Sequence, residues 1–416
     1  MKIWAKWIVG GLAIVLALAA CGDGETQEGV ALRPVGEQAA TPTPTPEPTA
    51  EAAEGAAQLT GRLLVLKGNT FEVLDLATGE TTALEGAAAF SSAVLNADRT
   101  RGVFVAFPNF GLLDLVRGET AVLESGGSQP IGLGIAPDGQ SMVALTGGGY
   151  ITQLWYGDLE THMLTNIAGS SQTGYQWVWD TDSQLVWWAT QAPDEVMRFD
   201  LASGESVPYE PETVQVAGSP LGSIAPGGAR LAIMPIAPDV AGQPAGEDVC
   251  VESEVHLYPT SMSRTETGQA AEVAWTEPGL VASSPAWLDD DTLLFVKLGN
   301  GACGVIEGEP LREIMLLDLG SGAEPRTVAG PIGNADDTND EEQRYGRQFG
   351  HLYSVSPDGR YVAWVAGGRA ADETLINVTE IETGATQAVL RYGADEATDA
   401  VDFIENTLIR QVVWLE

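Results

Sequence analysis

The chain has 416 residues and a formal net charge of −38, because 20 lysines and arginines face 58 aspartates and glutamates. Nucleic-acid binding depends on basic side chains that release counterions from phosphate, so this charge argues against a nucleic-acid partner. Hydrophobic residues make up 44% of the chain, which is too much for a wholly disordered acidic protein and enough to bury a core. The 49 glycines and 23 prolines favour a turn-rich β protein.

The N-terminus has the pattern of an export signal. Lys2 and Lys6 precede an apolar run over residues 7–20. The run is shorter than the roughly 20 residues of a membrane-spanning helix. The run ends in Leu18-Ala19-Ala20-Cys21, which resembles the lipobox of bacterial lipoproteins. The resemblance implies that residues 1–20 are a lipoprotein signal peptide and that Cys21 is diacylated and becomes the first mature residue. An ordinary secretory signal or a weak anchor is the alternative.

Acyl chains such as palmitate on the Cys21 thiol and amine would attach the protein stably to a membrane. We therefore predict a cell-envelope protein exposed outside the cytoplasm, with the membrane leaflet left open. Residues 21–60 hold the lipidated cysteine and a Pro/Thr-rich segment with alternating prolines from Pro42 to Pro48. Such a backbone is extended and stiff, so we predict a disordered spacer that lifts residues 61–416 off the lipid. A low-complexity tail without a selected length is the alternative.

The rest of the chain is a repeat with two markers. The first is Asp-Leu-x-x-Gly, at Asp75, Asp114, Asp200 and Asp318, with looser copies at Asp158 and Glu380 and a hidden one at His256-Leu257-Tyr258-Pro259. The second lies about 20 residues earlier and is a Pro-Asp-Gly turn, clean at Asp138 and Asp358 and degenerate at Asp98, Asp182, Gly227 and Asp290. Short apolar runs flank each turn and read as strands, and the early copies recur about every 40 residues, the length of a propeller blade.

This unit resembles the TolB-type propeller repeat over about residues 61–416. The resemblance implies that the Ser-Pro-Asp-Gly turn joins the two inner strands of a blade and that the third strand ends in Asp-Leu-x-x-Gly. We predict an all-β fold: a single β-propeller of seven four-stranded blades, closed by N- and C-terminal strands, with six or eight blades as alternatives. The predicted units span 91–125, 132–166, 175–211, 222–269, 283–330 and 352–390, and residues 61–85 join 398–416 in the seventh.

Several groups of residues could carry chemistry. The three histidines, His162, His256 and His351, fall in three different predicted blades, which disfavours a histidine metal site. No Gly-x-Ser-x-Gly elbow and no α/β segment are present, so the hydrolase half of a propeller peptidase is absent and we assign no catalytic residue.

Two cysteines remain besides Cys21, and they are a plausible pair in an exported protein. Cys250 and Cys303 both fall between the second and third strands of consecutive predicted blades. Equivalent loops of neighbouring blades emerge on the same face, so the two sulfurs could form a disulfide. The alternative is two separate thiols.

The acidic segment 334–342 places Asp336, Thr338 and Asp340 at alternating positions, as calcium loops do. It lacks the glycine and the twelfth-position glutamate of such loops, so a solvated charged loop is favoured over a structural Ca²⁺ site. Trp177, Trp179, Trp187 and Trp188 form a cluster, and we expect these side chains to pack between blades rather than to stack on a ligand.

Taken together, these patterns favour a non-catalytic, membrane-tethered module that binds an extracytoplasmic protein or small ligand through loops at about 236–253, 299–312 and 331–350. One alternative is a propeller enzyme of the lactonase, lyase or quinone-dehydrogenase kind with a cation or cofactor in the central channel. Another is a structural role in envelope assembly. Most of the negative charge falls after residue 60, so a cationic partner or a divalent cation fits better than a polyanion.

Overall fold

The computed structural model describes residues 59–86, 88–89, 91, 93–106, 109–123, 129–148, 151–170, 175–189, 192–200, 203–209, 213–218, 223–233, 255–259, 261–263, 272–275, 280–300, 312–332, 352–368, 373–393 and 409–415. They belong to one compact unit that spans residues 57–416. None of the described residues is helical, and so none forms a helix that could cross a membrane.

Short antiparallel strands build the described part of this unit. Because each strand lies between turn residues, it ends after a few residues and the chain folds back beside it. In chain order the strands are β1 (Arg62–Lys67), β2 (Thr70–Asp75), β3 (Thr81–Ala83), β4 (Val94–Leu95), β5 (Arg101–Ala106), β6 (Asn109–Asp114), β7 (Glu119–Leu123), β8 (Gln129–Ile135), β9 (Ser141–Gly148), β10 (Ile151–Asp158), β11 (Met163–Ser170), β12 (Tyr175–Asp180), β13 (Leu185–Ala189), β14 (Ala192–Asp200), β15 (Glu205–Pro208), β16 (Thr213–Gly218), β17 (Ser223–Ile224), β18 (Arg230–Ile233), β19 (Val255–Pro259), β20 (Ser261–Ser263), β21 (Glu272–Trp275), β22 (Leu280–Trp287), β23 (Thr292–Asn300), β24 (Arg312–Asp318), β25 (Arg326–Ala329), β26 (Tyr353–Val355), β27 (Tyr361–Gly368), β28 (Glu373–Glu380), β29 (Thr386–Gly393) and β30 (Ile409–Trp414).

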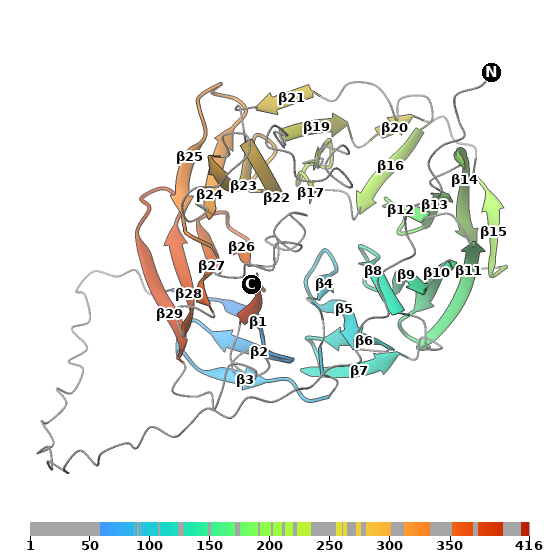
Figure 1. The fold of residues 1–416 in the computed structure, drawn as a ribbon, viewed down its shortest axis with the longest axis horizontal. Coiled ribbons are helices and arrows are strands. Elements are labelled where there is room, and N and C mark those ends of the chain that lie inside the picture. The colour runs from blue at the N-terminus through green and yellow to red at the C-terminus, as the bar shows by residue number, and fades with distance from the viewer. Residues whose placement is uncertain are drawn as a thin grey trace, which may run out of the picture. The chain divides into compact units, whose positions relative to one another are not determined.

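These strands form a seven-bladed β-propeller (Figure 1). Blade 1 has the order β3-β2-β1-β30, and blades 2, 3, 6 and 7 are the consecutive runs β4–β7, β8–β11, β22–β25 and β26–β29. Blade 4 is β12–β15, and blade 5 is β17, β18, β19 and β21. The predicted seven four-stranded blades are confirmed, which rules out six or eight. The hidden copy at His256 is the third strand of blade 5, as predicted.

Chain ends far apart in sequence complete blade 1. Strand β30 pairs antiparallel with β1, with Leu63 opposite Trp414 and Val65 opposite Val412. Since β30 takes the place of a first strand, the last residues close the ring that residue 62 opens. The predicted closure by strands from both termini is confirmed, and β30 covers the edge that β1 would otherwise expose.

The hydrophobic core is a ring of seven clusters, one between each pair of adjacent blades. Blades pack face to face, so both faces of most inner strands are buried and their sequences lack a simple apolar/polar alternation. The cluster between blades 3 and 4 holds Trp177, Trp179, Leu185 and Trp187, whereas Val186 and Trp188 face blade 5. The expectation that these tryptophans pack between blades is therefore confirmed.

One feature of the sheets has no counterpart in the repeat pattern. Strand β16 pairs with the innermost strand of blade 4, β12, and also with β20, so blade 4 continues into a six-stranded sheet. Val216 on β16 is buried beside Val178 and Val186. This ribbon fills the junction between blades 4 and 5, where the chain passes from one to the other.

Candidate binding surface

The Asp-Leu-x-x-Gly motifs form the turns between the third and fourth strands. Asp75 shows the local chemistry: its Oδ1 accepts the backbone N–H of Ala77 at 2.9 Å and that of Thr78 at 3.0 Å. The carboxylate thus accepts hydrogen bonds from turn N–H groups that have no partner in the strand ladder, which explains why aspartate ends the strand. The carboxylates of Asp114, Asp158 and Asp318 cap their turns in the same way.

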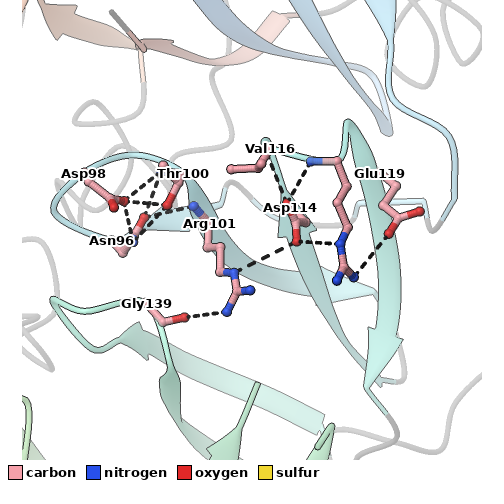
Figure 2. Close-up of polar contacts among 9 residues, drawn as sticks. Asn96, Asp98, Thr100, Arg101, Asp114, Val116, Glu119 and Gly139 are labelled. Carbon is pink, nitrogen blue, oxygen red and sulfur yellow. Dashed lines mark hydrogen bonds and ion pairs between the residues drawn. The ribbon is translucent and has the colours of Figure 1, made fainter. Parts of the chain in front are cut away.

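A second series of aspartate turns joins the first and second strands. In blade 2, Asp98 Oδ1 accepts hydrogen bonds from the Thr100 hydroxyl at 2.6 Å and from the Asn96 side chain at 2.6 Å (Figure 2). In blade 7, Asp358 Oδ1 accepts from the Ser356 hydroxyl at 2.6 Å and from the backbone N–H of Arg360 at 3.1 Å. The turns that the TolB-type resemblance predicted between the two inner strands are therefore present.

Both series lie on one face of the propeller, because the first and third strands of an antiparallel blade end on the same side. Arginines connect turns across this face. Arg101, the first residue of β5, approaches Asp114, the last residue of β6, at 4.0 Å and donates to the Gly139 carbonyl of the β8–β9 turn at 3.3 Å (Figure 2). Arg230, the first residue of β18, joins two turns of the second series by reaching Asp291 of the β22–β23 turn at 3.1 Å. We call the surface formed by these two series of turns the Asp-turn face.

Acidic residues dominate the described part of the Asp-turn face. They are Asp75, Glu80, Asp98, Asp114, Glu119, Asp138, Asp158, Glu160, Asp180, Asp182, Asp200, Glu205, Asp289, Asp290, Asp291, Asp318, Glu324, Asp358, Glu380 and Glu382. The arginines described there are Arg62, Arg101, Arg117, Arg230, Arg326 and Arg360, and Arg99 lies at the inner edge of the face. Closely spaced carboxylates make the local electrostatic potential negative and attract cations.

Hydrogen bonding keeps several of these carboxylates charged. The Thr78 N–H lowers the pKa of Asp75 below its usual value, and the Thr161 N–H does the same for the pKa of Asp158. The hydroxyls of Thr100 and Ser356 lower the pKa of Asp98 and Asp358 respectively. Donors that favour the ionised form cause these shifts, so the Asp-turn face stays negative at neutral and mildly acidic pH.

A cavity of about 520 Å³ lies in this face, at the seam between blades 7 and 1. Its lining residues are Thr60, Gly61, Arg62, Asp75, Ala77, Ser356, Pro357, Asp358, Tyr361 and Trp414. One wall is therefore the Asp-Leu-x-x-Gly turn of blade 1 and the other the Ser-Pro-Asp-Gly turn of blade 7. The rings of Tyr361 and Trp414 stack with centroids 6.2 Å apart and planes at 15°.

Near the innermost strands, Arg99 connects three blades. Its Nη1 donates to the carbonyl of Val355 on β26 and to that of Trp414 on β30, at 3.4 and 2.5 Å. Burial lowers the pKa of this guanidinium, since removal from water disfavours its charge. Arg99 thus places a positive charge beside the inner strands of blades 1 and 7.

Most sequence-predicted site residues fall outside the described residues. They are Cys21, Cys250, Cys303, Asp336, Thr338, Asp340 and His351, together with most of the three predicted binding loops. Of the other histidines, His162 lies in the β10–β11 turn of blade 3 and His256 on β19 of blade 5. Among the residues that the structure describes, no three His, Cys, Asp or Glu side chains gather as metal ligands would.

The seam cavity was not predicted from sequence. Asp75 and Asp358 were recognised as turn markers, but the sequence separates them by most of the chain. The signal that could have found the cavity was the expected joining of both termini in one blade, since this joining sets the first Asp-Leu turn beside the last Pro-Asp-Gly turn.

Comparison with known proteins finds similarity at the level of fold. No family model matches the chain, and no curated protein matches it. Among solved structures, TolB from Acinetobacter baumannii is 12% identical with a TM-score of 0.38, over 86% of this chain and 67% of that one. An oligogalacturonate lyase in complex with manganese is 16% identical, with a TM-score of 0.45 over 83% of this chain and 90% of that one.

The β-propeller domain of the Trilobed protease from Pyrococcus furiosus is 11% identical, with a TM-score of 0.44 over 82% of this chain and 96% of that one. At these identities the activities of the similar proteins do not transfer to this chain.

Proposed function

We propose that the chain is a lipid-anchored, extracytoplasmic β-propeller that binds a cationic protein partner through its Asp-turn face and catalyses no reaction. The observation that carries this proposal is the gathering of two series of aspartate turns on one face. A rigid ring whose described carboxylates far outnumber its arginines attracts a basic surface and orients it during encounter.

The predicted binding loops at 236–253 and 299–312 start from the other ends of the strands. The first lies between β18 and β19 and the second between β23 and β24, whose opposite ends carry the turns at Arg230 and Asp318. The Asp-turn face is thus a different surface from the one that loop length favoured. We propose it as the partner surface because its charge has a described structural basis.

Arg99 bears on the alternative of a propeller enzyme with a cation in its central channel. A guanidinium beside the inner strands of blades 1 and 7 repels a divalent cation that approaches it. The charge arrangement therefore supports cation attraction at the Asp-turn face more than at that part of the ring's interior.

Lipidation and charge-driven binding are tested separately. Cells grown with radiolabelled palmitate should label the wild-type protein, and Cys21→Ser should abolish the label and release the protein from membranes. The solubilised protein should retain basic protein partners at 50 mM NaCl and lose most of them at 500 mM, because salt screens exposed charges. Retention that does not change between these salt concentrations would contradict a charge-driven partner surface.

A further inference from the structure

We propose that the seam cavity receives one basic side chain, an arginine or a lysine, from the cationic protein partner. This inference rests on the proposed function and names the anchor by which that partner is held. Protein interfaces concentrate their binding energy in a few side chains that fill pockets, and arginine is enriched among them.

The cavity has the charge that such an anchor needs. Asp75 and Asp358 line it from blades 1 and 7 respectively, and hydrogen bonding favours the ionised form of both. The contacts recorded for both carboxylates use Oδ1, which accepts the turn donors. We infer that Oδ2 of each carboxylate makes the charge-assisted hydrogen bond with the guanidinium or ammonium group of the partner. Arg62 also lines the cavity, so two negative charges and one positive charge surround it.

The remaining walls suit the apolar stem of a long basic side chain. Tyr361 and Trp414 lie stacked on one another, and Pro357 and Ala77 add apolar surface. Arginine and lysine bury their methylene groups against such surface while their charged ends seek polar partners. A volume of about 520 Å³ falls within the usual range of ligand sites, so one side chain and its hydration fit.

The experiment uses the peptide Ac-Gly-Gly-Arg-Gly-Gly-NH₂, its lysine counterpart and its neutral citrulline counterpart, titrated into the protein and followed by ligand-observed NMR. Wild-type protein should bind the arginine and lysine peptides at least tenfold more tightly than the citrulline peptide. The double variant Asp75→Asn/Asp358→Asn should lose at least tenfold in affinity for the arginine peptide. Asparagine keeps the Oδ1 acceptor, so the turns should stay formed.

A matched control separates the cavity from the general charge of the face. Asp318→Asn/Asp138→Asn alters one turn of each series in blades 6 and 3, outside the cavity, and should change the affinity less than twofold. Ala77→Phe fills the cavity from an exposed turn position without removing a charge. Like Asp75→Asn/Asp358→Asn, it should lower the affinity for the arginine peptide at least tenfold. Equal losses in both double variants, or unchanged binding by Ala77→Phe, would overturn the anchor site.

Failure of this inference can be told apart from failure of the proposed function. If salt-sensitive retention of the partner survives in Asp75→Asn/Asp358→Asn, the face binds its partner without this anchor. If the peptides bind in the cavity but no basic partner is retained, the cavity is a site for free basic ligands and the proposed function is wrong. Binding of the citrulline peptide as tightly as the arginine peptide would show that charge does not select the occupant.

Discussion

The side-chain amide of Gln411 pairs with the backbone of Ala93 as another peptide group would. Its Oε1 accepts the Ala93 N–H and its Nε2 donates to the Ala93 carbonyl, both at 2.8 Å. Gln411 lies on the closing strand β30 and Ala93 precedes β4 of blade 2, so the pair joins the C-terminal strand to the next blade. Gln411 is only 1% exposed, and Ser354 Oγ accepts the Trp414 N–H on the blade 7 side at 2.9 Å.

We expect Gln411→Met to destabilise the protein by about 2–3 kcal/mol, because it leaves two buried backbone groups of Ala93 without partners. Urea unfolding followed by tryptophan fluorescence measures the loss. Gln387→Met replaces an exposed glutamine on β29 and serves as the control, with an expected change within about 0.5 kcal/mol. Equal stability of the two variants would show that the Gln411–Ala93 pair does not hold the ring closed.

The degenerate Pro-Asp-Gly turns store backbone strain. Ser183 has a φ of 58° in the position where Gly359 has a φ of 70°, and L-residues pay about 1–2 kcal/mol for this left-handed region. Ser183→Gly should therefore raise the midpoint of thermal unfolding, and Gly359→Ala should lower it. Differential scanning calorimetry measures both midpoints. Shifts of the same sign would contradict this account of the turns.

Acid should destabilise the fold through its turn aspartates. Folding lowers the pKa of Asp98 and Asp158 below the unfolded value of about 3.9. Their contribution is therefore complete above about pH 5 and is lost as the pH falls through the folded pKa. Asp98→Asn/Asp158→Asn should flatten the fall in unfolding free energy between pH 5 and pH 3, while Glu382→Gln should leave its slope near that of the wild type. A slope unchanged by the double variant would refute the capping role.

The pairing of Cys250 and Cys303 stays a prediction with a direct measurement. Blades 5 and 6 are adjacent, and the two cysteines fall between β18 and β19 and between β23 and β24 respectively. Native protein treated with an alkylating agent should therefore show no modified thiol at either position by intact mass. After reduction it should take up two additional groups. Two thiols that alkylate without reduction would contradict the disulfide.

Blade number was predictable because each blade carries its own turn chemistry. Asp138 and Asp318, for example, form turns whose hydrogen bonds are local. The turn sequence therefore predicts the turn in any blade, without knowledge of the neighbouring blades. The β16–β20 ribbon was not predictable, because Thr213–Gly218 carries neither turn marker and pairs with strands set by the ring. The seam cavity was missed for a similar reason, since Asp75 and Asp358 meet only after Gln411 and its neighbours close blade 1.

Site-specific photo-crosslinking in living cells tests most directly whether the Asp-turn face is the partner surface. A photo-reactive residue at Thr78 lies in the turn that follows β2 on that face, and one at Thr70 lies at the other end of β2, with both positions exposed. We predict that illumination of cells gives protein adducts from Thr78, that their crosslinked peptides are rich in lysine and arginine, and that Thr70 gives none of these adducts. Adducts formed from Thr70 alone would contradict the account.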